Sequence, residues 1–206
     1  MIVVAIFGVT AYQNISGTRT ATDFVEIPSI LMEYILRSSF GTKGQAGGER
    51  KDIVQQMFRA QPPRSVSQRE QAMNMLRQCH LAVFDQRLHG NEAHRPPGSG
   101  WSATAFQGTT QAILTPHQLH IDPLFYLRFS HLSHYGATYY AYTFCREAAK
   151  RIHQHAFGPE RCLTAEGGQM IREILLDWGG ARSGRDTLTD FFKHAPDVLH
   201  ALLPPS

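Results

Sequence analysis

The sequence predicts an all-α protein. Apolar residues recur at helical spacing in several long segments, and Ser67-x-x-Glu70 is a capping box that starts one of them. Paired glycines at residues 179–180 suit the end of another. No stretch shows a convincing alternation of apolar and polar residues, and there are no internal repeats. Together these observations favour a mostly helical chain.

The first predicted helix covers residues 24–36, which are apolar almost all round and therefore suit a buried helix. Its start is ambiguous. Asp23 is a candidate N-cap, but Pro28 then falls late for the first turn, so a kink or a later start is expected. Arg37 and Gly41 are typical of its end.

The next segments alternate between loops and helices. Residues 41–48 hold four glycines and indicate a loop, and residues 51–60 suit a short helix. The capping box at residues 67–70 opens a longer helix that ends at Gly90. Its expected inward face is the apolar stripe formed by Ala72, Met75, Leu76, Cys79 and Val83.

The second half of the chain follows the same pattern. Residues 91–110 are rich in Gly, Pro, Ser and Thr and indicate a long surface loop, while Pro116 and Pro123 interrupt the segment after it. Three further helices are expected, over residues 138–157, 170–178 and 186–193.

Composition excludes several classes of function. The chain has 206 residues, a formal net charge of +3 and a pI of about 8.9, with Lys and Arg scattered rather than clustered. We therefore expect no nucleic-acid partner. The apolar start is too short to span a bilayer, so no membrane association is expected. The three cysteines form no CxxC pair, which fits a reducing compartment.

One carboxylate is unusually placed. Glu26 stands between Val25 and Ile27, and a carboxylate in apolar surroundings is costly unless it is paired, capped or bound to a metal. Glu26 could be the third residue of a capping box opened by Asp23, or it could be a zinc ligand. The residues alone leave both interpretations of Glu26 open.

Histidine and tyrosine gather further along. Residues 129–142 contain His131, Tyr135 and Tyr142, which could form a packed aromatic cluster. Two histidine pairs have spacing that would place both rings on one helix face: His117 with His120, and His131 with His134. Neither pair has a nearby cysteine or paired carboxylate to complete a separate metal site.

Two blocks resemble a known family. Residues 16–34, SGTRTATDFVEIPSILMEY, and residues 129–142, FSHLSHYGATYYAY, resemble segments of the thimet oligopeptidase family of zinc metallopeptidases. The similarity is greatest to the branch that processes precursors imported into mitochondria. It extends over most of the chain from about residue 12. It implies that the all-α fold is the helical C-terminal part of a larger metallopeptidase catalytic domain.

The resemblance implies roles for four residues. Glu26 would be a metal ligand, the third in a His, His, Glu zinc site. His131, Tyr135 and Tyr142 would be catalytic, contacting the substrate backbone and the developing oxyanion. The spacing from His131 to Tyr135 is one residue shorter than in the oligopeptidases, so the role of Tyr135 follows from the mitochondrial branch. Apart from these four, Asp23 is more simply a helix cap but could instead orient a zinc-bound histidine, and Gly136 would give the tyrosine-bearing loop room to close.

The sequence departs from the family in one major respect. An HExxH motif, with two zinc ligands and the general base, should lie roughly two dozen residues before Glu26. No histidine here is followed by glutamate. Residues 1–11 do not resemble the family and are predicted to be an unrelated or misassigned start, with residues 12–206 a partial catalytic region. The missing N-terminal part of the catalytic domain is therefore an expected partner.

These inferences lead to two principal hypotheses. The first is a segment of a zinc metalloendopeptidase that removes short N-terminal peptides from imported precursor proteins in the mitochondrial matrix, and that is inactive alone without HExxH. The alternative is a non-catalytic helical protein that binds peptides. A small nucleic-acid module has only the basic pI in its favour.

Overall fold

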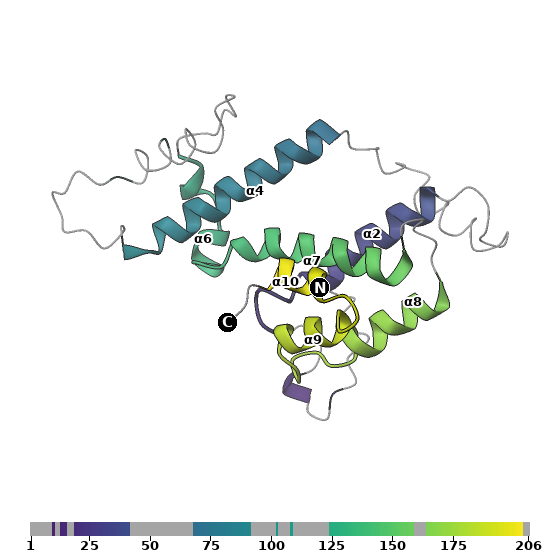
Figure 1. The fold of residues 1–206 in the computed structure, drawn as a ribbon. Coiled ribbons are helices and arrows are strands. Elements are labelled where there is room, and N and C mark those ends of the chain that lie inside the picture. The colour runs from purple at the N-terminus through teal and green to yellow at the C-terminus, as the bar shows by residue number, and fades with distance from the viewer. Residues whose placement is uncertain are drawn as a thin grey trace. The chain divides into compact units, whose positions relative to one another are not determined.

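The computed structural model describes residues 10, 13–15, 19–41, 68–91, 102, 108, 124–158 and 164–203. These residues form helices and turns and no strand, which confirms the predicted all-α fold (Figure 1). The expectations for residues 1–9, 51–60 and most of 92–123, including His117 and His120, lie outside the described residues. The chain divides into two compact units: unit 1 comprises Met1–Val66 and Cys145–Ser206, and unit 2 comprises Ser67–Phe144.

In unit 1 the first described helices are the short 3-10 helix η1 (Gln13–Ile15) and helix α2 (Ile27–Gly41). Since α2 starts at Ile27, Asp23 is not its N-cap, and Glu26 precedes the helix instead of occupying its third position. The capping-box interpretation is therefore wrong, and the later start that Pro28 suggested is what the structure shows. Pro28 lies at the second helical position, where its missing N–H costs nothing.

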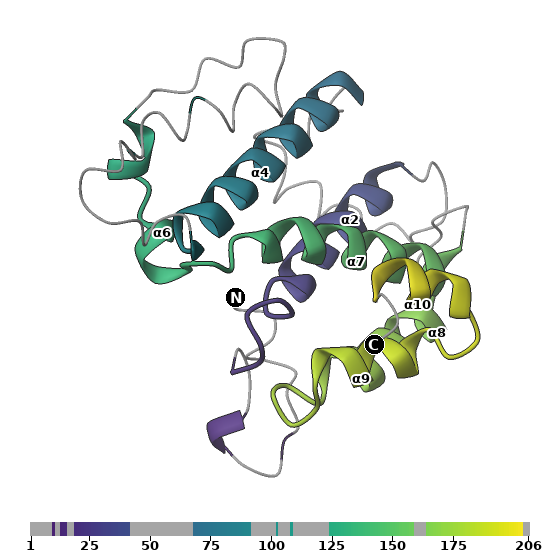
Figure 2. The ribbon, with the colours of Figure 1, turned by 60° about the vertical axis from the view of Figure 1, so that its left-hand side comes forward.

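Helix α7 (Tyr140–Phe157) belongs to both units, since unit 1 resumes at Cys145. Its residues Cys145, Ala149 and Ile152 are all fully buried. In unit 1 this core is completed by α2 and by the C-terminal helices, whose buried apolar residues are Ile171, Leu175, Leu176, Leu188, Phe191, Phe192 and Leu202. Figure 2 shows α7 and α2 side by side, as does Figure 1.

The C-terminal helices differ in their bounds from the sequence prediction. Helix α8 (Ala165–Met170) starts five residues earlier than expected because Thr164 caps it, and it continues into the π-helical η4 (Ile171–Leu176). Helix α9 (Gly184–Phe191) is capped by Ser183, which accepts a hydrogen bond from the amide of Asp186. The last helix, α10 (Pro196–Leu202), was not expected from the sequence.

Helix α4 (Gln68–Leu88) is the main element of unit 2, and its inward face differs from the predicted stripe. Ala72, Leu76 and Val83 are exposed. The buried residues are instead His80, Leu81, Ala82, Phe84 and Asp85. The prediction is wrong because the two polar members of this face, His80 and Asp85, made it look like a solvent-facing surface.

Two short helices and a turn lie in the described part of unit 2 just before α7. The 3-10 helix η3 (Phe125–Leu127) places Phe125 against Phe84, with ring centroids 5.3 Å apart. Helix α6 (His131–His134) follows, and a turn at residues 136–139 leads into α7. Both ribbon views place α6 beside the C-terminal end of α4 (Figures 1 and 2). This arrangement gathers the histidine- and tyrosine-bearing block around one end of α4.

Over the described ranges, every helix is too short or too polar to cross a lipid bilayer.

Candidate active site

The three predicted catalytic side chains come together in unit 2. The ring centroid of His131 lies 5.8 Å from that of Tyr135 and 5.9 Å from that of Tyr142. The two tyrosine rings are 6.2 Å apart, so the three rings form a triangle. All three residues are half-buried. Such proximity is what a joint role at one peptide group requires, and the role itself stays a prediction.

Two further aromatic residues complete this aromatic cluster, and the sequence analysis did not single them out. Phe129 stacks on His131 with centroids 4.9 Å apart. Tyr139 is buried, and its ring lies 5.7 Å from His131 and 5.1 Å from Tyr142. Tyr139 also packs with Leu81 and Ala82 of α4. The cluster is therefore both part of the hydrophobic core and the place where an imidazole and several phenols meet.

Burial makes the Tyr139 phenol a weaker acid than an exposed tyrosine. Desolvation raises the pKa of Tyr139 above its ordinary value of 10.0, and the carboxylate of Asp85 acts in the same direction. A hydrogen bond with Gln78 and the charge of Arg77 oppose this rise. A neutral phenol donates a hydrogen bond, which is the property that stabilising a developing oxyanion needs.

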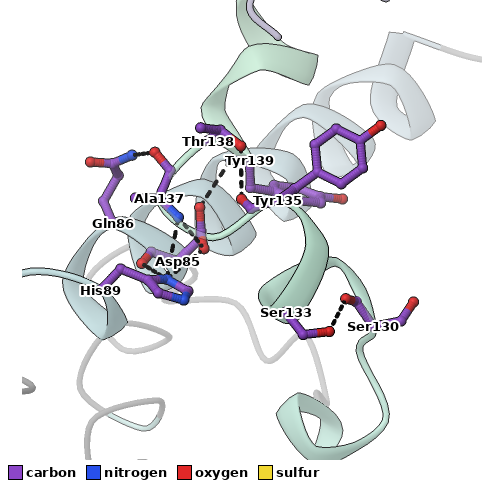
Figure 3. A network of polar contacts seen from close by, with 9 residues as sticks. All are labelled: Asp85, Gln86, His89, Ser130, Ser133, Tyr135, Ala137, Thr138 and Tyr139. Atoms are coloured by element: carbon purple, nitrogen blue, oxygen red, sulfur yellow. Dashed lines mark hydrogen bonds and ion pairs between the residues drawn. The ribbon is translucent and has the colours of Figure 1, made fainter.

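A polar network fastens the turn before α7 to the end of α4 (Figure 3). Asp85 is fully buried, and its carboxylate accepts hydrogen bonds from the amides of Ala137 at 3.1 Å and Tyr139 at 2.9 Å. His89 Nδ1 lies 2.9 Å from the same carboxylate. The side-chain amide of Gln86 donates to the carbonyl oxygen of Ala137. Asp85 and Gln86 of α4, together with His89 directly after the helix, thus contact a single turn.

A local signal in the sequence could have identified Asp85. It follows Leu81–Phe84 directly, so it is a carboxylate in an apolar stretch, as Glu26 is. The same reasoning applied to both residues would have marked Asp85 as a buried, hydrogen-bonded group. Its partners could not have been inferred, since they come from more than fifty residues further along the chain.

Glu26, the predicted metal ligand, lies in unit 1. It is half-buried at the end of the turn that precedes α2. Ser29 donates its hydroxyl to Glu26 Oε2 at 3.0 Å and lies 2.9 Å from the Glu26 carbonyl oxygen. The turn is supported from α7, where the Cys145 thiol donates to the carbonyl oxygen of Asp23 at 3.2 Å. Glu26 therefore has a defined local conformation.

The described residues do not make a complete zinc site. Within these ranges no three His, Cys, Asp or Glu side chains are grouped so that they could hold a metal ion. A catalytic zinc needs three protein ligands, and Glu26 is one carboxylate. His134, the other half of the second histidine pair, is exposed and lies with Nδ1 3.0 Å from the carbonyl oxygen of Ser130.

A hollow of about 550 Å³ lies elsewhere, on α8 and η4 in unit 1. Its lining residues are Gly168, Gln169, Arg172, Glu173 and Asp177. None of the residues predicted to be functional lies in it, so it is not the site that the sequence indicated.

The comparisons with known proteins identify the family. The sequence pattern of Peptidase family M3 matches residues 4–201. The chain is 34% identical to mitochondrial intermediate peptidase of Coprinopsis scobicola over 190 residues, covering 86% of this chain and 22% of that protein. It is 33% identical to the Schizosaccharomyces pombe protein of the same name over 181 residues, covering 87% of this chain and 23% of the relative.

A third relative, mitochondrial intermediate peptidase of Chaetomium globosum, is 35% identical over 182 residues, covering 84% of this chain and 22% of that protein. The chain thus spans less than a quarter of the length of these relatives. The match over residues 4–201 and the similarity to these peptidases show that the chain belongs to peptidase family M3.

Proposed function

We propose that this chain is the substrate-contacting segment of a zinc metalloendopeptidase. His131, Tyr135 and Tyr142 would bind the substrate backbone and donate hydrogen bonds to the oxygen that becomes negative as the peptide bond is attacked. The observation that carries the proposal is the meeting of these three rings within about 6 Å of one another in a chain of this family. Glu26 would supply one ligand of a metal site completed by residues outside this chain.

We further propose that the substrates are precursor proteins imported into the mitochondrial matrix, from which a short N-terminal peptide is removed. The support is the name of the similar proteins, which are mitochondrial intermediate peptidases. Since no HExxH motif occurs in the 206 residues, we expect the chain to be inactive alone.

A chimera tests this proposal. The chain replaces the matching 181-residue region of the S. pombe relative, which supplies the rest of a catalytic domain. We expect the chimera to bind zinc and to cleave a precursor peptide. His131→Gln, Tyr135→Phe and Tyr142→Phe should each lower kcat by roughly a hundredfold, as removal of an oxyanion donor does. Tyr140→Phe is the matched control, because Tyr140 is 43% exposed on the same helix as Tyr142.

The zinc content of the chimera distinguishes the proposed role of Glu26 in metal binding from the proposed role of the rings in catalysis. Glu26→Gln should remove zinc from the chimera, whereas the tyrosine variants should retain it. A folded chimera that binds zinc but fails to cleave the peptide would count against the catalytic role. The missing HExxH favours one alternative, a non-catalytic peptide-binding protein. In that case the 206-residue chain alone should bind a fluorescent precursor peptide, and Tyr135→Phe should weaken this binding.

A further inference from the structure

The carboxylate of Asp85 has three polar partners in unit 2. The residue has no exposed surface, and each of its oxygens accepts an amide hydrogen bond from a different residue of the turn at 136–139. His89 Nδ1 contacts Oδ1 at 2.9 Å. Hydrogen bonds to a carboxylate are roughly twice as strong as those between neutral groups. Asp85 is therefore the strongest link between α4 and this turn.

The turn needs such a link to keep its shape. Ala137 has a φ of 60°, the left-handed region that residues with a Cβ avoid at a cost of about 1–2 kcal/mol. Conformations of this kind persist only where the surroundings enforce them. Here α4 holds Ala137 on both sides, because Asp85 accepts its N–H and Gln86 donates to its carbonyl oxygen (Figure 3).

The turn at residues 136–139 also fixes the positions of the aromatic rings. The Thr138 amide and hydroxyl both donate to the carbonyl oxygen of Tyr135, at 2.9 and 2.8 Å. Tyr139, whose amide binds Asp85 directly, packs its ring against both His131 and Tyr142. A shift of the turn would therefore move Tyr135 and Tyr139 relative to His131.

We propose that Asp85 is a positioning residue for the aromatic cluster, acting through the turn at 136–139. Its oxygens are occupied and shielded from solvent, so it does not touch the substrate. The effect of Asp85 on the rate of peptide cleavage rests on the proposed function, whereas its effect on the positions of the rings does not. Gln86 contributes to the same restraint from the surface of α4, as the exposed donor to Ala137.

The full 206-residue chain labelled with 3-fluorotyrosine provides the test, because its seven tyrosines give separate ¹⁹F signals that Tyr→Phe variants assign. Asp85→Asn keeps the size of the side chain but turns an NH₂ group toward a backbone N–H. We expect the signals of Tyr135 and Tyr139 to shift and that of Tyr34, in unit 1, to stay. Asp190→Asn is the matched control, since Asp190 pairs with Arg182 at 3.0 Å in unit 1, and it should shift neither signal.

Gln86→Ala provides a second test in case Asp85→Asn unfolds the chain. Its side chain is exposed, so its removal leaves the core of unit 2 intact. We expect the same two signals to shift, by less than in Asp85→Asn. Unchanged Tyr135 and Tyr139 signals in a folded Asp85→Asn chain would overturn the proposal. If Asp85→Asn shifts the signals of all seven tyrosines, the substitution has disturbed the whole fold and Gln86→Ala becomes the test. An unchanged Tyr135 signal in Gln86→Ala would then overturn the positioning proposal.

Kinetics of the chimera then separate positioning from general stability. Asp85→Asn should lower kcat roughly tenfold with little change in KM, because a displaced group costs rate more than binding. Asp85→Glu, which keeps the carboxylate, should recover part of the loss. Shifted ring signals together with an inactive parent chimera would refute the proposed function alone. Unshifted signals would refute the positioning role whatever the activity.

Discussion

The thiol of Cys145 donates to the carbonyl oxygen of Asp23 at 3.2 Å, which joins two positions 122 residues apart. Cys145 lies on α7 and has no exposed surface. Asp23 belongs to the turn that ends in Glu26, directly before α2. The position of the predicted metal ligand in unit 1 thus depends on the packing of α7 as well as on the residues around Glu26 itself.

Burial makes Cys145 unreactive. Burial raises the pKa of Cys145 to about 12, and the nearby carboxylates of Glu26 and Asp23 act in the same direction. At about pH 8 the reactive thiolate is then a fraction on the order of 10⁻⁴. We expect iodoacetamide to leave Cys145 unmodified in the folded chain and to modify it in urea, as read by peptide mass spectrometry. Modification at the rate of the half-buried Cys79 would contradict this expectation.

Gly180→Ala should destabilise unit 1. A Cβ at residue 180 would lie 2.0 Å from the carbonyl oxygen of Arg19, and this backbone atom cannot easily move. The clash would also strain the hydrogen bond from the Gly180 amide to the Ile15 carbonyl oxygen at 2.7 Å. We expect a loss of about 2 kcal/mol in the free energy of unfolding, measured by urea denaturation.

Gly168→Ala is the matched control for that substitution. Gly168 lies inside α8, and a Cβ there would meet nothing within 4 Å. Because alanine favours a helix over glycine, we expect a gain of about 0.5–1 kcal/mol. If Gly168→Ala also lowered the free energy of unfolding, a Cβ at residue 168 would not have the open space that the structure shows there.

His80 should make unit 2 sensitive to acid. It is fully buried on α4, and within the described residues neither ring nitrogen has a hydrogen-bond partner. Desolvation lowers the pKa of His80 below its ordinary value of 6.5. As the pH falls through 6.5, the unfolded chain binds a proton that the folded chain does not, so stability is full above that pH and declines below it.

His80→Leu should remove much of this dependence, because leucine has no titratable group and no unsatisfied polar atom. Urea unfolding between about pH 7.5 and 5 measures it, with stability falling less in His80→Leu than in the parent chain. His200→Gln is the control, since His200 is exposed on α10. Equal slopes in the parent and in His80→Leu would contradict the assigned role of burial.

The sequence was sufficient to predict the helical class and to single out His131, Tyr135 and Tyr142. It was insufficient to predict that Phe129 and Tyr139 join them, or to predict which face of α4 is buried. Apolar periodicity indicates a face only when the polar residues point outward. On α4 the inward face carries His80 and Asp85, so the pattern selected a stripe that includes the exposed Leu76 and Val83. Burial of the Asp85 carboxylate is tolerated because backbone amides of the turn before α7 donate hydrogen bonds to it. The sequence around Asp85 does not indicate these partners, which lie more than fifty residues away.

The start of α2 shows a different limit. Asp23 and Glu26 have the spacing of a capping box, and that spacing alone favoured an early start. In the structure Pro28 lies in the first helical turn and α2 begins at Ile27. Proline restricts the backbone covalently, whereas a cap contributes only about 1 kcal/mol, so the stronger constraint decides the boundary.

Residues 136 and 137 should respond in opposite directions to exchanges between glycine and alanine. Ala137 has a φ of 60°, so Ala137→Gly relieves a strained backbone and should stabilise the folded chain by about 0.5 kcal/mol after the added entropy of the unfolded state. At Gly136 a Cβ would lie 2.8 Å from Nε2 of His89, which must then move and weaken its contact with Asp85. We therefore expect Gly136→Ala to cost about 1 kcal/mol or more.

Urea denaturation of both variants provides the measurement, and each serves as the control for the other because the two positions are adjacent. If the turn is held in shape by α4, relief of strain at residue 137 and crowding at residue 136 act on the same contacts with opposite sign. If Ala137→Gly and Gly136→Ala change the free energy of unfolding in the same direction, Asp85 and Gln86 do not enforce the left-handed conformation of Ala137. The restraint on Tyr135 would then have to come from the packing of the rings alone.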